Sequence, residues 1–194
     1  MEYKHDLVEK TKEFVKRSFQ KNPHFSFNHW SVMYNHSVTV QELVMKISEE
    51  VECNKTVAAI GALLHDIGKT HHADPETLHK NHESFNLSVS QEFLNSLGLD
   101  IDELKHVRDI ISYSSDSTEM KIVKDADAVA LYFDKKLYML WIEWVFKNGL
   151  TDEIQRKLGK FDLLNFDISR RLGKPKLEQM KNDWDEYQRK IKGV

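Results

Sequence analysis

The sequence predicts an all-α protein, and three observations support this prediction. The 194 residues include only seven glycines and three prolines, so few positions interrupt regular structure. Apolar residues recur mostly at steps of three and four rather than at alternate positions. Charged residues make up 30% and hydrophobic residues 40% of the chain, a balance typical of a folded protein with a packed core. We expect a single compact multi-helix domain over residues 1–194.

Helix-end signals bound the first three predicted helices. A helix over residues 3–20 is expected to stop before Pro23, because proline discourages its continuation. A second is expected over residues 31–51, where apolar residues form a stripe at helical spacing. Asn54 is a good N-cap for a third helix over residues 55–67. This third segment is the most apolar of the three, which predicts that it lies in the core.

The middle of the chain contains a glycine stop and a capping pattern. Gly68 is a natural terminator of the third helix, and residues 69–76 are expected to be looser. Apolar residues at helical spacing predict a further helix over residues 82–97. Asp100 opens a capping-box pattern for a short helix over residues 101–112. These segments predict that the chain continues as helices joined by short connections.

The last part of the chain is also expected to be helical. The run SYSSDST reads as a loop, in which Ser117 or Thr118 caps the next helix. Three further helices are expected, over residues 136–148, residues 151–164 and, with Pro175 at an N1-like position, residues 176–191. No repeat or convincing linker divides the sequence, so the prediction remains one domain.

Composition limits the classes of function. A single cysteine, Cys53, excludes an intramolecular disulfide and suits a reducing compartment. The first residues are charged and contain no apolar core of signal-peptide length, and the stretch LYMLWIEWVF is too short to span a membrane. We therefore expect a cytoplasmic protein. The net charge of −3 provides no global positive field for nucleic acid or anionic membranes.

Four polar residues stand where apolar surroundings are expected. His36 lies on the apolar stripe of the second helix, and His65 and Asp66 end the apolar third helix. Asp125 lies within the predicted helical segment KIVKDADAVA. Burying such groups without a partner costs several kcal/mol, whereas two imidazoles and two carboxylates suit a divalent ion. We expect these four side chains to hold one divalent metal ion, namely Mn, Fe, Co, Ni, Zn or Mg.

The order of these residues resembles a known family. The series His36, His65, Asp66 and Asp125, with its central pair inside LLHDIGK, resembles a family signature. This is the H…HD…D signature of the HD-domain superfamily of metal-dependent phosphohydrolases. The resemblance covers about residues 28–135. It implies a helical core in which the four residues bind a divalent metal, and a reaction in which a water on that metal attacks a phosphorus centre. Residues 136–194 are expected to form a C-terminal helical extension.

Three residues are candidates for catalysis. Asp66 can both hold the ion and orient the attacking water. Lys69 can meet a phosphate oxygen as a point charge, although a lysine there can instead complement the helix dipole. His82 lies where two-metal relatives carry a further histidine, but DIISYSSDS lacks the next one, which favours one ion and an acid-base or phosphate-contacting role for His82. Asp127 lies two residues from Asp125 and is assigned no ligand role, because it faces away on a regular helix.

The residues and the resemblance together predict a hydrolase. The leading hypothesis is a metal-dependent phosphohydrolase acting on a small phosphate ester, with a nucleotide or related metabolite as substrate. The alternative is a metal- and nucleotide-binding sensor or interaction module with little turnover. Nucleic-acid binding through residues 170–176 is a third hypothesis, in which association depends on salt. The sequence is compatible with a homo-oligomer.

Overall fold

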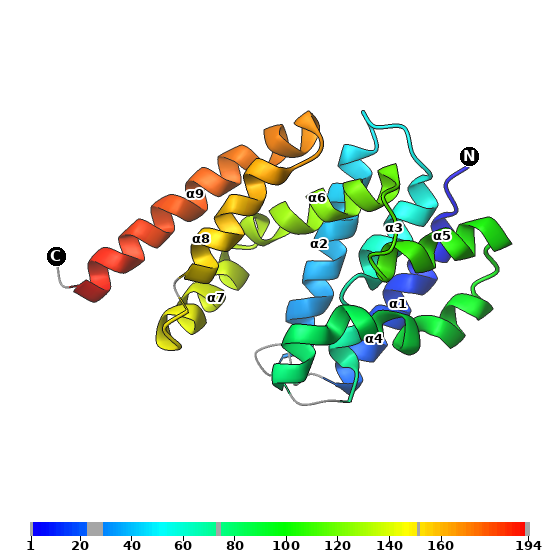
Figure 1. Ribbon diagram of the computed structural model, residues 1–194, viewed down its shortest axis with the longest axis horizontal. Helices are drawn as coiled ribbons and strands as arrows, with labels where there is room; N and C mark the ends of the chain where they lie inside the picture. Colours follow the sequence, from blue (N-terminus) through cyan, green and yellow to red (C-terminus); the bar gives the residue numbers. More distant parts are fainter. Residues whose placement is uncertain (1, 23–28, 73–74, 151, 193–194) are drawn as a thin grey trace. The chain divides into compact units, whose positions relative to one another are not determined.

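The computed structural model describes residues 2–22, 29–72, 75–150 and 152–192. These residues form α-helices and short 3-10 segments, and no strand occurs among them (Figure 1). The predicted all-α class is therefore confirmed. The chain divides into two compact units, Met1–Val123 and Lys124–Val194, so that helix α6 contributes to both.

The helices of the chain follow one another with short connections. Those up to the division are α1 (His5–Lys21), α2 (Ser31–Ile47), α3 (Lys55–Leu64), η2 (Ile67–Thr70), α4 (Pro75–Ser96), α5 (Ile101–Ile111) and α6 (Thr118–Phe133). The second unit continues with α7 (Lys135–Lys147), α8 (Asp152–Gly159), η3 (Lys160–Leu163) and α9 (Asp167–Lys192). Within the described residues, no helix is long and apolar enough to cross a bilayer.

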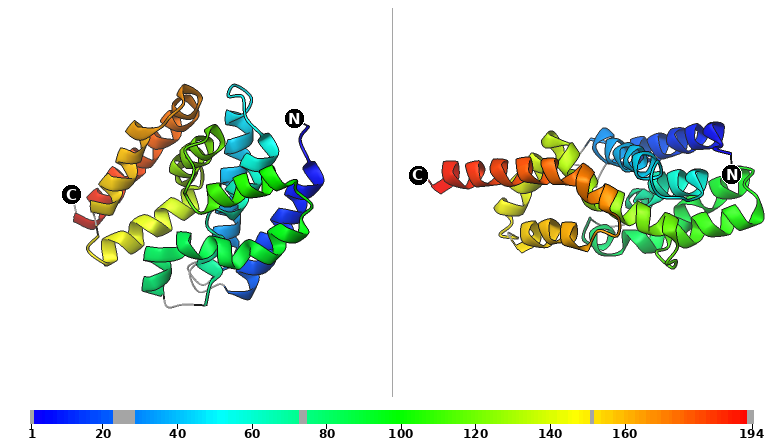
Figure 2. Two further views of the ribbon diagram at one scale, coloured as in Figure 1. Left: turned by 45° about the vertical axis from the view of Figure 1, so that its right-hand side comes forward. Right: turned by 90° about the horizontal axis from the view of Figure 1, so that it is seen from above.

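Helix α3 is the centre of the first unit. Every residue from Thr56 to Leu64 is buried, as the apolar sequence of this segment predicts. Helices α1, α2 and α5 pack against α3, and Figure 2 shows α1 and α2 beside it from two directions. Gly61 permits the contact with α5, since a Cβ there would lie 2.7 Å from Ile110 Cγ2. The polar residues that follow α3 are thereby carried into the interior.

Local caps start several of these helices as the sequence predicts. The Asn54 side chain accepts hydrogen bonds from the backbone at the start of α3, and Asp100 forms a complete capping box with Glu103. Ser117 Oγ accepts a hydrogen bond from Met120 N at the start of α6. Such caps satisfy backbone N–H groups that a helix leaves unpaired.

Four predicted boundaries are wrong. The second helix ends at Ile47 rather than near residue 51, the third ends at Leu64 rather than near residue 67, and α4 already begins at Pro75. Helix α9 begins at Asp167 and continues through Pro175, which was expected to start a new helix. An internal proline costs about 3 kcal/mol because it lacks an N–H group, and tertiary packing of the helix outweighs that cost. Met180 is fully buried, for example.

The second unit packs α9 closely against the end of α6. A Cβ at Gly173 on α9 would lie 2.8 Å from Val129 Cγ1 and 3.0 Å from Phe161 Cε2. The hydroxyl of Tyr132 on α6 donates a hydrogen bond to Lys157 O on α8, at 3.1 Å. The predicted C-terminal extension is thus held onto α6 by small-residue packing and by hydrogen bonds.

Candidate metal centre

The His65-Asp66 pair lies at the end of α3, where the chain turns into η2. His65 is 1% exposed and Asp66 is 4% exposed. Asp66 has φ −115° and ψ 9°, so it leaves the helical conformation and separates α3 from η2. An apolar helix that ends inside the unit therefore places an imidazole and a carboxylate where water is largely excluded.

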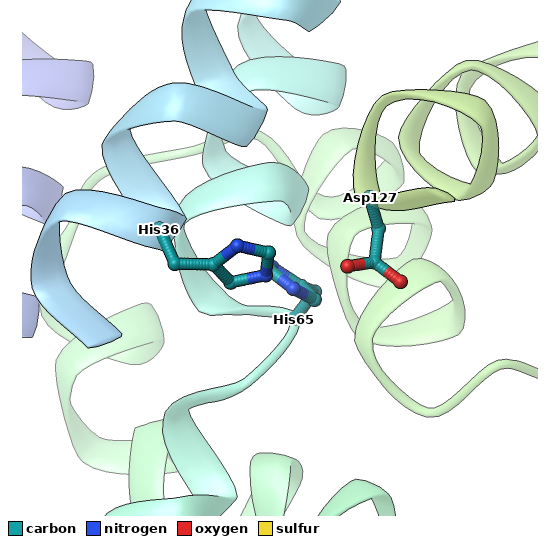
Figure 3. A group of neighbouring side chains, drawn as sticks. All are labelled: His36, His65 and Asp127. Carbon is teal, nitrogen blue, oxygen red and sulfur yellow. The ribbon is translucent and has the colours of Figure 1, made fainter. Parts of the chain in front are cut away.

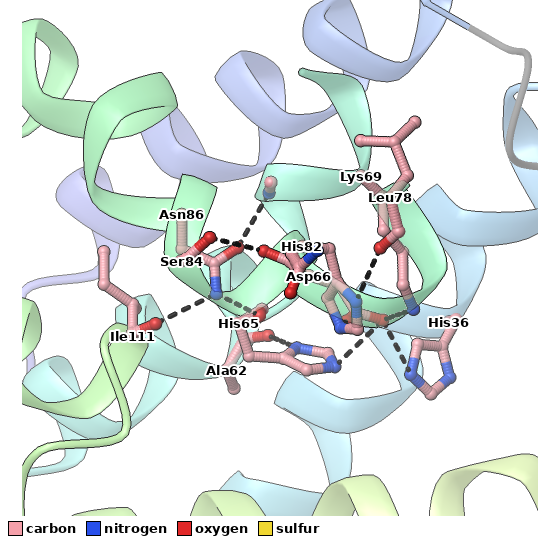
Figure 4. Close-up of polar contacts among 12 residues, drawn as sticks. His36, Ala62, His65, Asp66, Lys69, Leu78, His82, Ser84, Asn86 and Ile111 are labelled. Atoms are coloured by element: carbon pink, nitrogen blue, oxygen red, sulfur yellow. Dashed lines mark hydrogen bonds and ion pairs between the residues drawn. The ribbon is translucent and has the colours of Figure 1, made fainter. Parts of the chain in front are cut away.

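Four cationic or imidazole groups surround the Asp66 carboxylate (Figure 4). Lys69 Nζ lies 2.5 Å from Oδ2, and His65 Nε2 and His36 Nε2 lie 3.4 Å and 3.7 Å from the same oxygen. His82 Nε2 lies 3.1 Å from Oδ1. The structure therefore brings together His36, His65, Asp66, Lys69 and His82, which are five of the six residues that the sequence predicts for the site.

These neighbours keep the Asp66 carboxyl group ionised. Burial alone would raise its pKa, but the charge of Lys69, the charge of His65 and hydrogen bonds from His65 and His82 lower the pKa well below its ordinary value. An ionised carboxylate beside imidazole nitrogens offers the kinds of donor atom that bind divalent cations. The negative charge is thus maintained in the interior of the unit.

The imidazole rings are oriented by backbone carbonyls. His65 Nδ1 lies 2.7 Å from Ala62 O, and His82 Nδ1 lies 3.1 Å from Leu78 O. An Nδ1–H group that donates to a carbonyl fixes the ring and directs Nε2 toward a metal or a carboxylate. Both Nε2 atoms point toward Asp66 (Figure 4). Because Nδ1 of His65 is committed to a carbonyl, loss of the Nε2 proton on metal binding would leave the Nε2 lone pair for the cation.

His36 reaches the same place from α2. Its ring centroid lies 5.3 Å from that of His65, with the ring planes inclined by 60°. One ring nitrogen of each residue lies within 4.8 Å of the other (Figure 3). With Asp66, the first unit therefore offers two imidazole nitrogens and a carboxylate, a donor set that fits the divalent ions expected from the sequence.

Gly68 allows η2 to approach α4. A Cβ at this position would lie 1.9 Å from His82 O and 2.9 Å from Asn86 N. Any larger residue would therefore push the turn that carries Asp66 away from the helix that carries His82. The glycine of LLHDIGK thus has a packing role in addition to the helix-stop role that the sequence predicts.

Asp125 lies in the second unit, where its carboxylate binds the backbone of the turn before α9. Its carboxylate accepts hydrogen bonds from Asn165 N at 2.9 Å, from Asn165 Nδ2 at 2.7 Å and from Phe166 N at 3.0 Å. Both carboxylate oxygens are used, and the bonds fix the turn that leads into α9. Asp127, also on α6 (Figure 3), is partly exposed. The role of Asp125 depends on residues forty positions later, so no local pattern in DAD could show it.

Comparison with known proteins agrees with this architecture. Residues 33–132 match the HD domain family, a range that contains every predicted site residue. The crystal structure of an HD-superfamily hydrolase from Bacillus thuringiensis is similar with a TM-score of 0.68 and 20% sequence identity, covering 98% of this chain and 99% of that chain. No curated protein matches the chain significantly. Since the family match covers more than half of the chain and includes Asp66 and the histidines around it, the protein belongs to the HD domain family.

Proposed function

We propose that the protein is a metal-dependent phosphohydrolase that acts on a small phosphate ester, with a nucleotide or related metabolite as the expected substrate. The observation that carries the proposal is the buried Asp66 carboxylate, ringed by three histidines and a lysine at the end of α3. Membership of the HD domain family supports it. So does the similar fold of a protein described as an HD-superfamily hydrolase.

The first unit supplies three of the proposed metal ligands, namely His36, His65 and Asp66. The fourth ligand that the sequence predicts, Asp125, lies in the second unit, where both of its carboxylate oxygens accept hydrogen bonds. When bound, a divalent ion supplies a Lewis acid that activates water and neutralises charge on phosphate oxygens.

The chain's own residues perform the remaining tasks. His82 Nε2 lies 3.1 Å from Asp66 Oδ1; a cation bound by that carboxylate would release this end of the imidazole, which we propose then contacts a phosphate oxygen or gives its proton to the leaving oxygen of an ester. His82 is 18% exposed in its side chain, so it is the most accessible of the three histidines around Asp66. Lys69 provides an ammonium group beside the same carboxylate, and we propose that it contacts a phosphate oxygen of the substrate.

Phosphate release tests this function. The purified protein is incubated with a panel of nucleotides and sugar phosphates, each with added Mn, Co, Ni, Mg or Zn. We expect metal-dependent release from at least one compound, and its loss in Asp66→Ala. Asp102→Asn, which changes an exposed carboxylate on α5, is the matched control and should retain activity.

The same experiment distinguishes the hydrolase from the alternative function, a metal- and nucleotide-binding sensor or interaction module. Tight nucleotide binding by metal-loaded protein, with no product over hours, would support a sensor and contradict the hydrolase. Equal phosphate release from wild type and Asp66→Ala would remove this site from the reaction.

A further inference from the structure

We propose that Asn86 is a positioning residue that holds the His65-Asp66 turn in the geometry needed for metal binding. The inference rests on the proposed metal site and concerns a residue outside the LLHDIGK motif. Asn86 lies on α4 and is 0% exposed. An amide side chain in a fully buried position must satisfy its hydrogen-bonding groups, and its partners identify its task.

The Asn86 amide binds three backbone groups at once (Figure 4). Its Nδ2 group donates to His65 O at 2.6 Å and to Ile111 O at 2.9 Å. Its Oδ1 accepts from Gly68 N at 2.7 Å. These bonds connect the turn after α3 with the end of α5, so one side chain satisfies polar backbone groups from two segments.

Two of these backbone groups lie on either side of Asp66. His65 O precedes it directly and Gly68 N follows two residues later, so the Asn86 amide spans the backbone that carries the carboxylate. On α4, Asn86 lies four residues after His82, which places both side chains on the same face of the helix. The amide therefore determines where the Asp66 turn lies relative to His82.

Close packing makes this placement sensitive to small changes. A Cβ at Gly68 would lie 2.9 Å from Asn86 Oδ1, so the turn and the amide are in close contact with no room for a further atom. Ser90 Oγ donates to the backbone carbonyl of Asn86 at 2.6 Å and thereby holds α4 itself. Loss of a hydrogen-bonding partner behind a metal ligand typically weakens metal affinity by about 10–100-fold.

The test compares Asn86→Asp with Leu94→Ala. Asn86→Asp keeps the shape and the acceptor for Gly68 N, but it replaces the donor to His65 O and Ile111 O by a carboxylate oxygen. Leu94 is a buried residue on the same helix, and its truncation lowers stability without removing a bond to the turn. Metal-free full-length proteins are titrated with Co²⁺ at a temperature where circular dichroism shows each to be folded.

We expect Asn86→Asp to weaken Co²⁺ binding by about 10–100-fold and to change the visible spectrum of the bound ion. Leu94→Ala should show a reduced Tm with wild-type affinity and spectrum. If Asn86→Asp does not fold, Asn86→Ser, which keeps one donor, replaces it, and a smaller loss of affinity is expected. Wild-type affinity and spectrum in the folded Asn86 variant would overturn the inference alone, whereas a wild type without Co²⁺ binding would overturn the proposed function itself.

Discussion

Substitution of Gly68 by alanine tests the close approach of η2 to α4. The added Cβ would lie 1.9 Å from His82 O, whereas ordinary contact begins at 3.4 Å, so the turn and the helix must separate by about 1.5 Å (3.4 − 1.9). A shift of this size breaks the 2.7 Å bond from Gly68 N to Asn86 Oδ1. An unsatisfied buried polar group costs about 1–3 kcal/mol, and overpacking adds about 1–3 kcal/mol. The expected loss of unfolding free energy is therefore about 2–6 kcal/mol.

Urea denaturation followed by circular dichroism measures this loss. Gly159→Ala is the matched control, because a Cβ there meets no atom within 4 Å and the residue has a helical φ of −65°. The control should change stability by at most about 1 kcal/mol. A Gly68→Ala protein that is as stable as Gly159→Ala would refute the argument that only glycine fits between the two segments.

Two further predictions concern the second unit. Asp125→Asn should lower the Tm, because the side chain loses hydrogen bonds that fix the turn into α9, whereas Asp127→Asn, which changes a partly exposed carboxylate on the same helix, should change the Tm little. Thermal denaturation of both proteins checks this, and an equal Tm in the two variants would contradict it. The Asp183 carboxylate accepts hydrogen bonds from Lys135 and from the Tyr138 hydroxyl, and these bonds, that from Lys135 most strongly, lower the pKa of the carboxyl group. A carboxyl whose pKa is lower in the folded state stabilises the protein above its unfolded pKa, and this stabilisation disappears as the pH falls through the folded pKa. Denaturation between neutral and acid pH should therefore show Asp183→Asn less stable than wild type at neutral pH, with the difference vanishing in acid; a difference independent of pH would contradict this.

The sequence predicts those parts of the fold that depend on local signals. The apolar third helix is buried as expected, and the Asp100 capping box needs only residues within one turn. The continuation of α9 through Pro175 could not be predicted in this way. Local chemistry there favours a helix start, and packing between distant residues decides otherwise.

In the candidate site, too, only the residues that a local motif marks could be predicted from the sequence. LLHDIGK places His65 and Asp66 next to each other in sequence, so their common location needs no tertiary information. Asn86 carries no motif, and its role becomes visible only when its amide is seen to bind the backbone on both sides of Asp66. The role of Asp125 likewise depends on hydrogen bonds from a turn forty residues later.

Metal content is the most direct test of the central claim that the turn after α3 binds a divalent ion. Elemental analysis of the purified wild type and of Asp66→Asn, both shown to be folded, compares the bound metal per chain. We predict about one divalent ion per wild-type chain and a large loss of bound metal in the variant. A wild type without metal, even after incubation with Mn, Fe, Co, Ni, Zn or Mg, or equal metal content in both proteins, would contradict it.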